Sequence, residues 1–182
     1  MPKVIVVVRP ESILPLDLVK QHLRIDHSAE DALLQTYIAA ATEEIDGPDG
    51  WLGVSLGRQT LEWQGDSFPA DGSSPIMLPC GPVFQIVSVS YTDRDGGSQS
   101  FADHELFGQD LFVKRGSRWP STICRPAAAR IRYESGHVQE AVPTPVIQAL
   151  LIMVEDFWER RAVDGPMHPT AARLLAPRRV WI

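Results

Sequence analysis

The sequence has little cysteine and lacks any long apolar run, and these two shortages limit the class of protein. Its two cysteines, Cys80 and Cys124, stand near prolines in stretches typical of loops, so we expect free thiols and no disulfide framework. The apolar run Val4–Val8 has five residues, fewer than the core of a signal peptide needs. The run that starts at Ile147 is interrupted by Gln148 and is too short to span a bilayer. We therefore expect a soluble protein.

Basic residues are also scarce. The chain has 17 lysines and arginines against 23 aspartates and glutamates, which gives a net charge of −6. A surface built mainly to hold nucleic acid normally carries a basic excess, so that class is disfavoured, although a local basic patch remains open. The 182 residues, of which 44% are apolar and 22% charged, fit one globular domain with no internal repeat.

The best-marked element is a helix predicted over residues 29–46. Ser28 stands where an N-cap residue should, and Asp31, three positions later, is placed to complete a capping box. Gly47 and Pro48 follow the last apolar residue and predict the helix end. The helix carries an apolar stripe at helical spacing, formed by Leu34, Ile38, Ala41 and Ile45.

Two further helices are predicted at about 15–25 and 145–162, the latter with Thr144 as N-cap residue and Pro145 in its first turn. The stretch between the helices at 29–46 and 145–162, about 58–135, is rich in short β-forming runs and turns, with a hairpin turn at Asp93–Gly97. We therefore predict an α+β fold: a three-helix core with a β-rich insertion between the second and third long helices. Residues 1–164 form this domain, and residues 165–182 add a short helix and a C-terminal arm.

Candidate chemistry is weak. Gly53-Val54-Ser55-Leu56-Gly57 matches the G-x-S-x-G pattern of serine hydrolases, but a helix precedes it and a strand follows, the reverse of the nucleophile elbow. A small hydrolase using Ser55 and a monomeric binding module stay open as alternatives. Asp26, His27, Glu30 and Asp31 would suit a metal, but capping accounts for two of them and no second histidine stands at helical ligand spacing. We expect no cofactor, no metal and no catalytic constellation.

The last residues, Ala176–Ile182, form a basic and apolar tail. Tryptophan and arginine are the residue types that most often anchor interfaces, and this segment has too few apolar residues to fold alone. We predict an interaction arm that orders on binding, with a disordered terminus as the alternative.

Several short motifs, in this order, carry a resemblance to a known family. They are residues 18–26 (LVKQHLRID), 30–34 (EDALL), 57–63 (GRQTLEW), 78–79 (LP), 87–89 (VSV), 119–120 (WP), 142–145 (VPTP) and 174–179 (LLAPRR). With these motifs in this order, the sequence resembles the head-tail connector, or adaptor, family of long-tailed bacteriophages and gene transfer agents. Cys80-Gly81 and the Val4–Val8 extension depart from what the resemblance leads us to expect.

The resemblance implies a non-enzymatic structural protein of the virion neck, present in the host cytoplasm before assembly. It implies a ring of about twelve copies between the portal and the tail. The implied partners are the portal protein, a tail-side neck or stopper protein and other copies of the chain, and DNA passes through the channel without sequence-specific binding. The expected portal-binding residues are Leu174, Leu175, Ala176, Pro177, Arg178, Arg179, Val180, Trp181 and Ile182.

A ring also requires two different contact faces on each copy, because neighbours meet head to tail. Acidic and basic residues lie in separate stretches of this sequence, and we expect them to supply the two faces. The ring-contact residues predicted on this basis are Glu43, Glu44, Arg58, Arg115 and Arg118.

Overall fold

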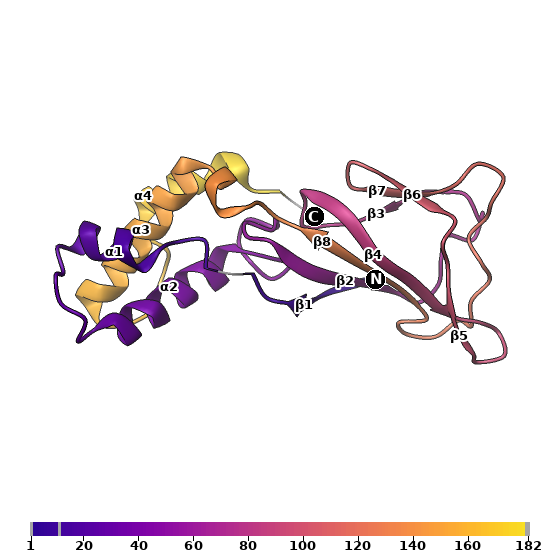
Figure 1. The fold of residues 1–182 in the computed structure, drawn as a ribbon, viewed down its shortest axis with the longest axis horizontal. Helices are drawn as coiled ribbons and strands as arrows, with labels where there is room; N and C mark the ends of the chain where they lie inside the picture. Colours follow the sequence, from indigo (N-terminus) through magenta and orange to yellow (C-terminus); the bar gives the residue numbers. More distant parts are fainter. Residues whose placement is uncertain (1, 11, 181–182) are drawn as a thin grey trace. The chain divides into compact units, whose positions relative to one another are not determined.

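The structure, a computed structural model, describes residues 2–10 and 12–180 and divides into two compact units (Figure 1). The helical unit comprises Pro10–Gly57 and His137–Ile182. The strand unit comprises Met1–Arg9 and Arg58–Gly136. The β-rich insertion expected at about 58–135 is therefore the larger part of a unit that the N-terminal residues complete. The fold is α+β, with helices in one unit and antiparallel sheets in the other.

Four α-helices form the helical unit. They are α1 (Leu16–Leu23), α2 (Asp31–Ile45), α3 (Thr144–Arg160) and α4 (Pro169–Leu175), with short 3₁₀ turns at Gln139–Ala141 and Ala176–Arg178. α3 contacts each of the other three helices (Figure 1). The expected core of three helices is thus incomplete, because α4 adds the buried side chains of Ala171 and Leu175 to the same apolar cluster.

The apolar stripe predicted for α2 is the face that α3 covers. Its four residues are buried together with the inward side chains of α3, and the rings of Tyr37 and Phe157 lie 6.2 Å apart between the two helices. Burying one such aliphatic side chain contributes roughly 1.5–3 kcal/mol, so this face supplies much of the unit's stability. No helix among the described residues is long and apolar enough to cross a membrane.

The start of α2 differs from the expectation. The helix begins at Asp31, with Glu30 as its N-cap residue and no side-chain capping bond, so the capping box at Ser28 is wrong. The Asp31 carboxylate accepts a hydrogen bond from Lys20 Nζ at 2.7 Å, and this pairing with α1 draws it away from the helix terminus. α3 begins at Thr144, which is its first helical residue rather than its cap.

The strand unit contains two antiparallel sheets. The five-stranded sheet has the order β1-β2-β8-β4-β5, from β1 (Lys3–Val8), β2 (Gln59–Gly65), β8 (Ala129–Ser135), β4 (Val83–Thr92) and β5 (Ser98–Ser100). The three-stranded sheet has the order β3-β7-β6, from β3 (Ile76–Met77), β7 (Asp110–Val113) and β6 (His104–Phe107). The predicted hairpin turn joins β4 to β5, and Asp93 Oδ1 accepts a hydrogen bond there from the Gly97 backbone N–H at 2.7 Å.

The core of the strand unit lies on one face of the five-stranded sheet. Alternate residues of paired strands point into it, as the burial of Leu61 opposite Tyr133 and of Trp63 opposite Ile131 shows. The Tyr133 hydroxyl donates to the carbonyl of Pro79 at 2.9 Å, so the one polar atom of this ring is satisfied.

Candidate functional site

The C-terminal segment, expected as a free arm, is folded onto its own helical unit as far as Val180. Leu175 is fully buried in the helical core. The chain then passes through the 3₁₀ turn Ala176–Arg178, where Arg178 Nη1 donates to the carbonyl of Leu174 at 3.4 Å. The described part of the segment is therefore already ordered on its own subunit, whereas the sequence predicted an arm that orders on binding. Trp181 and Ile182 lie outside the described residues.

The end of this segment contacts the loop that follows α2. The guanidinium of Arg179 lies over the ring of Trp51, 4.5 Å from its centroid. The backbone N–H of Val180 donates to the carbonyl of Leu52 at 2.9 Å. The side chains of Ala176, Pro177 and Val180 remain exposed and are the part of the segment that a partner can reach without unfolding it.

The loop that receives the segment runs from Gly47 to Gly57 after α2. Its backbone folds back on the helix, with the Trp51 N–H donating to the carbonyl of Glu44 at 2.9 Å. Ser55, the serine of the G-x-S-x-G match, is fully buried in this loop. A nucleophile elbow requires an exposed hydroxyl, so the arrangement does not support the hydrolase alternative.

The acidic ring-contact candidates lie at the end of α2. Glu43 is exposed, whereas Glu44 is half-buried. Burial raises the pKa of Glu44 above its usual range, and the nearby charge of Arg160 opposes this shift. Glu43 is therefore the more accessible of the two for a contact with another copy.

The basic candidates lie in the strand unit. Arg58 precedes β2 and places its guanidinium over the ring of Phe84, 4.5 Å from the centroid. Arg115 and Arg118 are exposed in the loop between β7 and β8. Of the 23 acidic residues, 14 are in the helical unit, which has 7 basic ones; the strand unit has 9 acidic and 10 basic residues. The excess negative charge of the chain thus belongs to the helical unit.

Three of the four suspected metal ligands, His27, Glu30 and Asp31, lie beside ionisable partners. His27 Nε2 lies 3.8 Å from Glu30 Oε2, and Asp31 pairs with Lys20 as described above. No group of three or more potential ligand side chains is found among the described residues.

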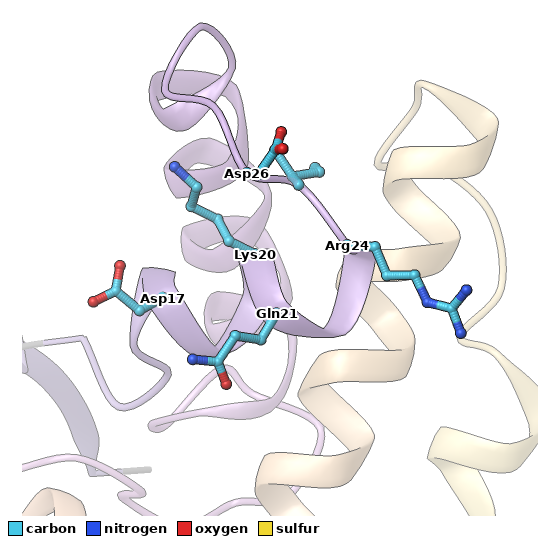
Figure 2. Close-up of a pocket in the computed structure, with 6 residues that line it drawn as sticks. Asp17, Lys20, Gln21, Arg24 and Asp26 are labelled. Atoms are coloured by element: carbon cyan, nitrogen blue, oxygen red, sulfur yellow. The ribbon is translucent and has the colours of Figure 1, made fainter.

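A shallow pocket of about 450 Å³ opens beside α1 (Figure 2). It is lined by acidic and basic side chains, one amide and one apolar side chain: Asp17, Lys20, Gln21, Arg24, Ile25 and Asp26. Figure 2 shows Arg24 extending away from Asp26, so the charges do not converge on a single point in the pocket. This arrangement provides no nucleophile paired with a base, and its mixed charges do not form a binding site for a cation or an anion.

One polar feature was not predicted from the sequence. Glu62 of β2 is only 4% exposed, although it lies on the sheet face opposite the core. Burial alone would raise its pKa, but hydrogen bonds from Gln64 Nε2 at 2.7 Å and Arg132 Nε at 2.6 Å lower the pKa below its usual range. Glu62 and Arg132 face each other across paired strands, a register that sequence spacing does not reveal.

Comparison with known proteins gives the family. Residues 14–105, half of the chain, match the profile of the phage gp6-like head-tail connector proteins. The chain belongs to this family. The match covers α1, α2 and the strands from β2 to β5, so it includes both candidate acidic residues and Arg58. A search of curated proteins finds no match to the chain.

Solved structures extend the likeness to nearly the whole chain. A chain from the virion of a native gene transfer agent particle is 19% identical with a TM-score of 0.77, and the alignment covers 98% of this chain and 96% of the other. A chain from the neck of an empty gene transfer agent particle, with C6 symmetry, is 20% identical with a TM-score of 0.78 over 99% and 96%. A chain from the neck of a native particle, with C12 symmetry, is 18% identical with a TM-score of 0.71 over 99% and 96%. At these identities the likeness establishes a shared fold.

Proposed function

We propose that the chain is a structural, non-enzymatic subunit of the neck of a phage or gene transfer agent particle, where it forms a ring between the portal and the tail. The observation that carries the proposal is its membership of the head-tail connector family together with a fold shared over nearly its full length with chains of virion and neck structures. The ring would hold about twelve copies, in keeping with the C12 symmetry of one similar neck. Its further partners would be the portal protein and a tail-side neck or stopper protein.

The charge distribution suits a channel through which DNA moves. A wall with an acidic excess repels the phosphate backbone and lets a duplex pass without sequence-specific binding. The helical unit carries this excess, and the strand unit is close to neutral. We therefore propose that DNA meets no continuous basic surface on the ring.

Omission of the chain during particle assembly tests the proposed function. Without it, we expect heads that contain the portal but lack tails, and we expect the purified chain to restore tail attachment when added back. A cryo-EM map of the complete neck should contain a ring of this fold. Tailed, infectious or transducing particles assembled without the chain would contradict the proposal.

The C-terminal segment remains our proposed portal contact. We expect a chain truncated after Arg178 to keep α4 and the helical core but to lose portal binding, because it lacks Arg179 and the apolar residues that follow. Truncation before Leu174 is a poor test, since it also removes the buried Leu175. Portal binding is measured by co-sedimentation, with circular dichroism as the control for folding. Undiminished portal binding by the chain truncated after Arg178 would overturn the assignment.

The charged ring contacts are tested by charge reversal at the exposed position. Glu43→Lys should weaken ring formation, whereas Asp49→Lys, a reversal at another exposed acidic residue of the helical unit, should not. Reversal of Glu44 is avoided because its half-buried side chain lies near Arg160. Equal assembly of both variants with the unmodified chain would remove the support for Glu43 as a contact.

A further inference from the structure

The strand β1 forms one outer edge of the five-stranded sheet and is apolar on both of its faces. It pairs with β2 on one side, and no described strand pairs with its other side. Val6, Val7 and Val8 are 39%, 40% and 56% exposed. An exposed edge strand of β-branched residues readily pairs with another chain, and monomeric proteins usually protect such edges with charges or prolines. Here only Lys3 and the residue after Val8 supply charge, at the two ends.

A second open edge lies at the other side of the same sheet. β5 pairs with β4 only at Ser90–Thr92, and among the described residues no strand covers β4 between Val83 and Ser88 on that side. This edge also exposes apolar side chains, Phe84 at 39% and Val87 at 49%. β2 and β8 separate the two edges, which places them about 14 Å apart at the usual strand spacing.

The two apolar edges stand at the same level along the sheet. One cross-strand row consists of Val8, Thr60, Glu134 and Gln85. The next row consists of Val6, Leu61, Tyr133 and Ile86. On β1, Val7 forms a bulge between these two rows. On β4, Phe84 forms a bulge just before the first row and Val87 forms one just after the second row. Contact between the two edges therefore needs no shift along the strands, as a closed ring without a helical rise requires.

The strand directions agree as well. All pairings from β1 through β2 and β8 to β4 are antiparallel, so β1 and β4 run in opposite directions. A copy placed beside the sheet in the same orientation would thus set its β1 antiparallel to the β4 of its neighbour. The interface is heterologous, and repetition of it around an axis closes a ring.

We propose that β1 of one copy packs edge to edge, in antiparallel orientation, against the Val83–Ser88 edge of β4 in the next copy. The contact buries Val7 and Val8 against Phe84 and Val87. The bulges on both edges restrict the pairing to an edge of matching shape, which protects the free subunit from other strands. This inference rests on the proposed function, because it names the surface through which that ring closes.

Arg58, predicted from the sequence as a ring contact, fits this interface. Its guanidinium already covers one face of the Phe84 ring. The guanidinium would close the rim of the apolar contact on the β4 side, where arginine is a favoured residue type. The basic ring-contact candidate and the apolar edge therefore belong to the same surface.

Cysteine cross-linking in assembled particles tests the pairing. The full-length chain carries Cys124→Ser, so that the buried Cys80 is its only native thiol, and the double variant adds Val7→Cys and Val87→Cys. A short bismaleimide should then produce a ladder of covalent multimers that ends at the complete ring. Each single-cysteine variant should yield monomer only. A dimer from a single-cysteine variant would reveal an isologous contact and overturn the proposal.

Lysine substitution gives an independent test. Val87→Lys should lower incorporation into the neck by roughly tenfold or more, because a charge would be buried at the edge contact. Val163→Lys is the matched control, since Val163 is also 49% exposed but lies outside the strand unit, and it should assemble within about twofold of the unmodified chain. Equal incorporation of the two variants would contradict the edge contact.

The outcomes separate the two proposals. If the unmodified chain is present in the neck but the double-cysteine variant, incorporated there, gives no ladder, the edge pairing is wrong and the connector function stands. If the unmodified chain is absent from the neck, the proposed function fails, and the edge pairing fails with it.

Discussion

Replacement of Leu175 by alanine tests whether α4 belongs to the helical core. The side chain is fully buried in the apolar cluster shared with α3, two residues before the sequence reaches Pro177. Truncation of a buried leucine to alanine loses the transfer free energy of the removed atoms and leaves a cavity, which together cost about 2–5 kcal/mol. α4 has only 7 residues and is followed by the exposed Ala176 and Pro177, so the surroundings can relax and we expect a value near 2–3 kcal/mol.

The assay is chemical denaturation followed by circular dichroism at the helix band. Leu174→Ala is the matched control, because it removes the same atoms from a half-buried leucine of the same helix. We expect its cost to be about half that of Leu175→Ala. If both variants unfold at the same denaturant concentration as the unmodified chain, α4 does not pack as the structure describes, and the anchoring of the C-terminal segment is refuted.

Two further predictions concern the strand unit. Because the pKa of Glu62 is lowered on folding, the stability that its ionised form contributes is complete above the unfolded pKa of about 4.3 and is lost as the pH falls through the lower folded pKa. Glu62→Gln should therefore flatten the acid unfolding profile and cost about 1–2 kcal/mol at pH 7 through its weakened bond to Arg132, and an unchanged profile would contradict the ion pair. Tyr133→Phe should cost about 1 kcal/mol in thermal unfolding, because the Pro79 carbonyl loses its donor; a cost near zero would show that water replaces the hydroxyl.

The sequence predicts the long helices well because their apolar residues recur at the helical period. The stripe of α2 and the apolar face of α3 each identify a helix without knowledge of its partner. Their ends are less predictable. The capping box at Ser28 failed, and Asp31 instead pairs with Lys20 of α1, which precedes it by 11 residues and so lies outside the four-residue capping pattern.

The sites were less predictable than the helices. A basic and apolar tail is predicted to be a free arm only if no surface of its own chain binds it. Here the Trp51–Leu52 loop binds it, and this loop lies more than a hundred residues earlier in the sequence. Likewise, the short apolar run Val4–Val8 fits either an edge strand or an extended arm when only the sequence is considered. Its pairing with β2 shows that it is an edge strand. The second edge follows from the partial pairing of β5 with β4, and the register of the sheet places the two edges at the same level.

The magnitudes of the C-terminal contacts decide how the segment would reach a portal. Withdrawal of α4 exposes Leu175 and Ala171 and costs several kcal/mol. Release of the chain from Arg179 onward exposes no such buried side chain among the described residues. The cation–π contact with Trp51 and the backbone hydrogen bond to Leu52, which that release breaks, contribute about 1–2 kcal/mol. We therefore expect the segment to open after Arg178 while α4 stays in place.

Trp51→Leu provides the test of this opening, because it weakens the contact that holds Arg179 without changing the segment itself. If release precedes portal binding, the variant should bind the portal up to about fivefold more tightly, since about 1 kcal/mol of the opening cost is removed. Binding is measured by titration of the purified chain against portal rings, with thermal unfolding to show that the helical unit remains intact. Weaker binding by Trp51→Leu would mean that the portal recognises the segment in its folded position, with Arg179 held over the Trp51 ring.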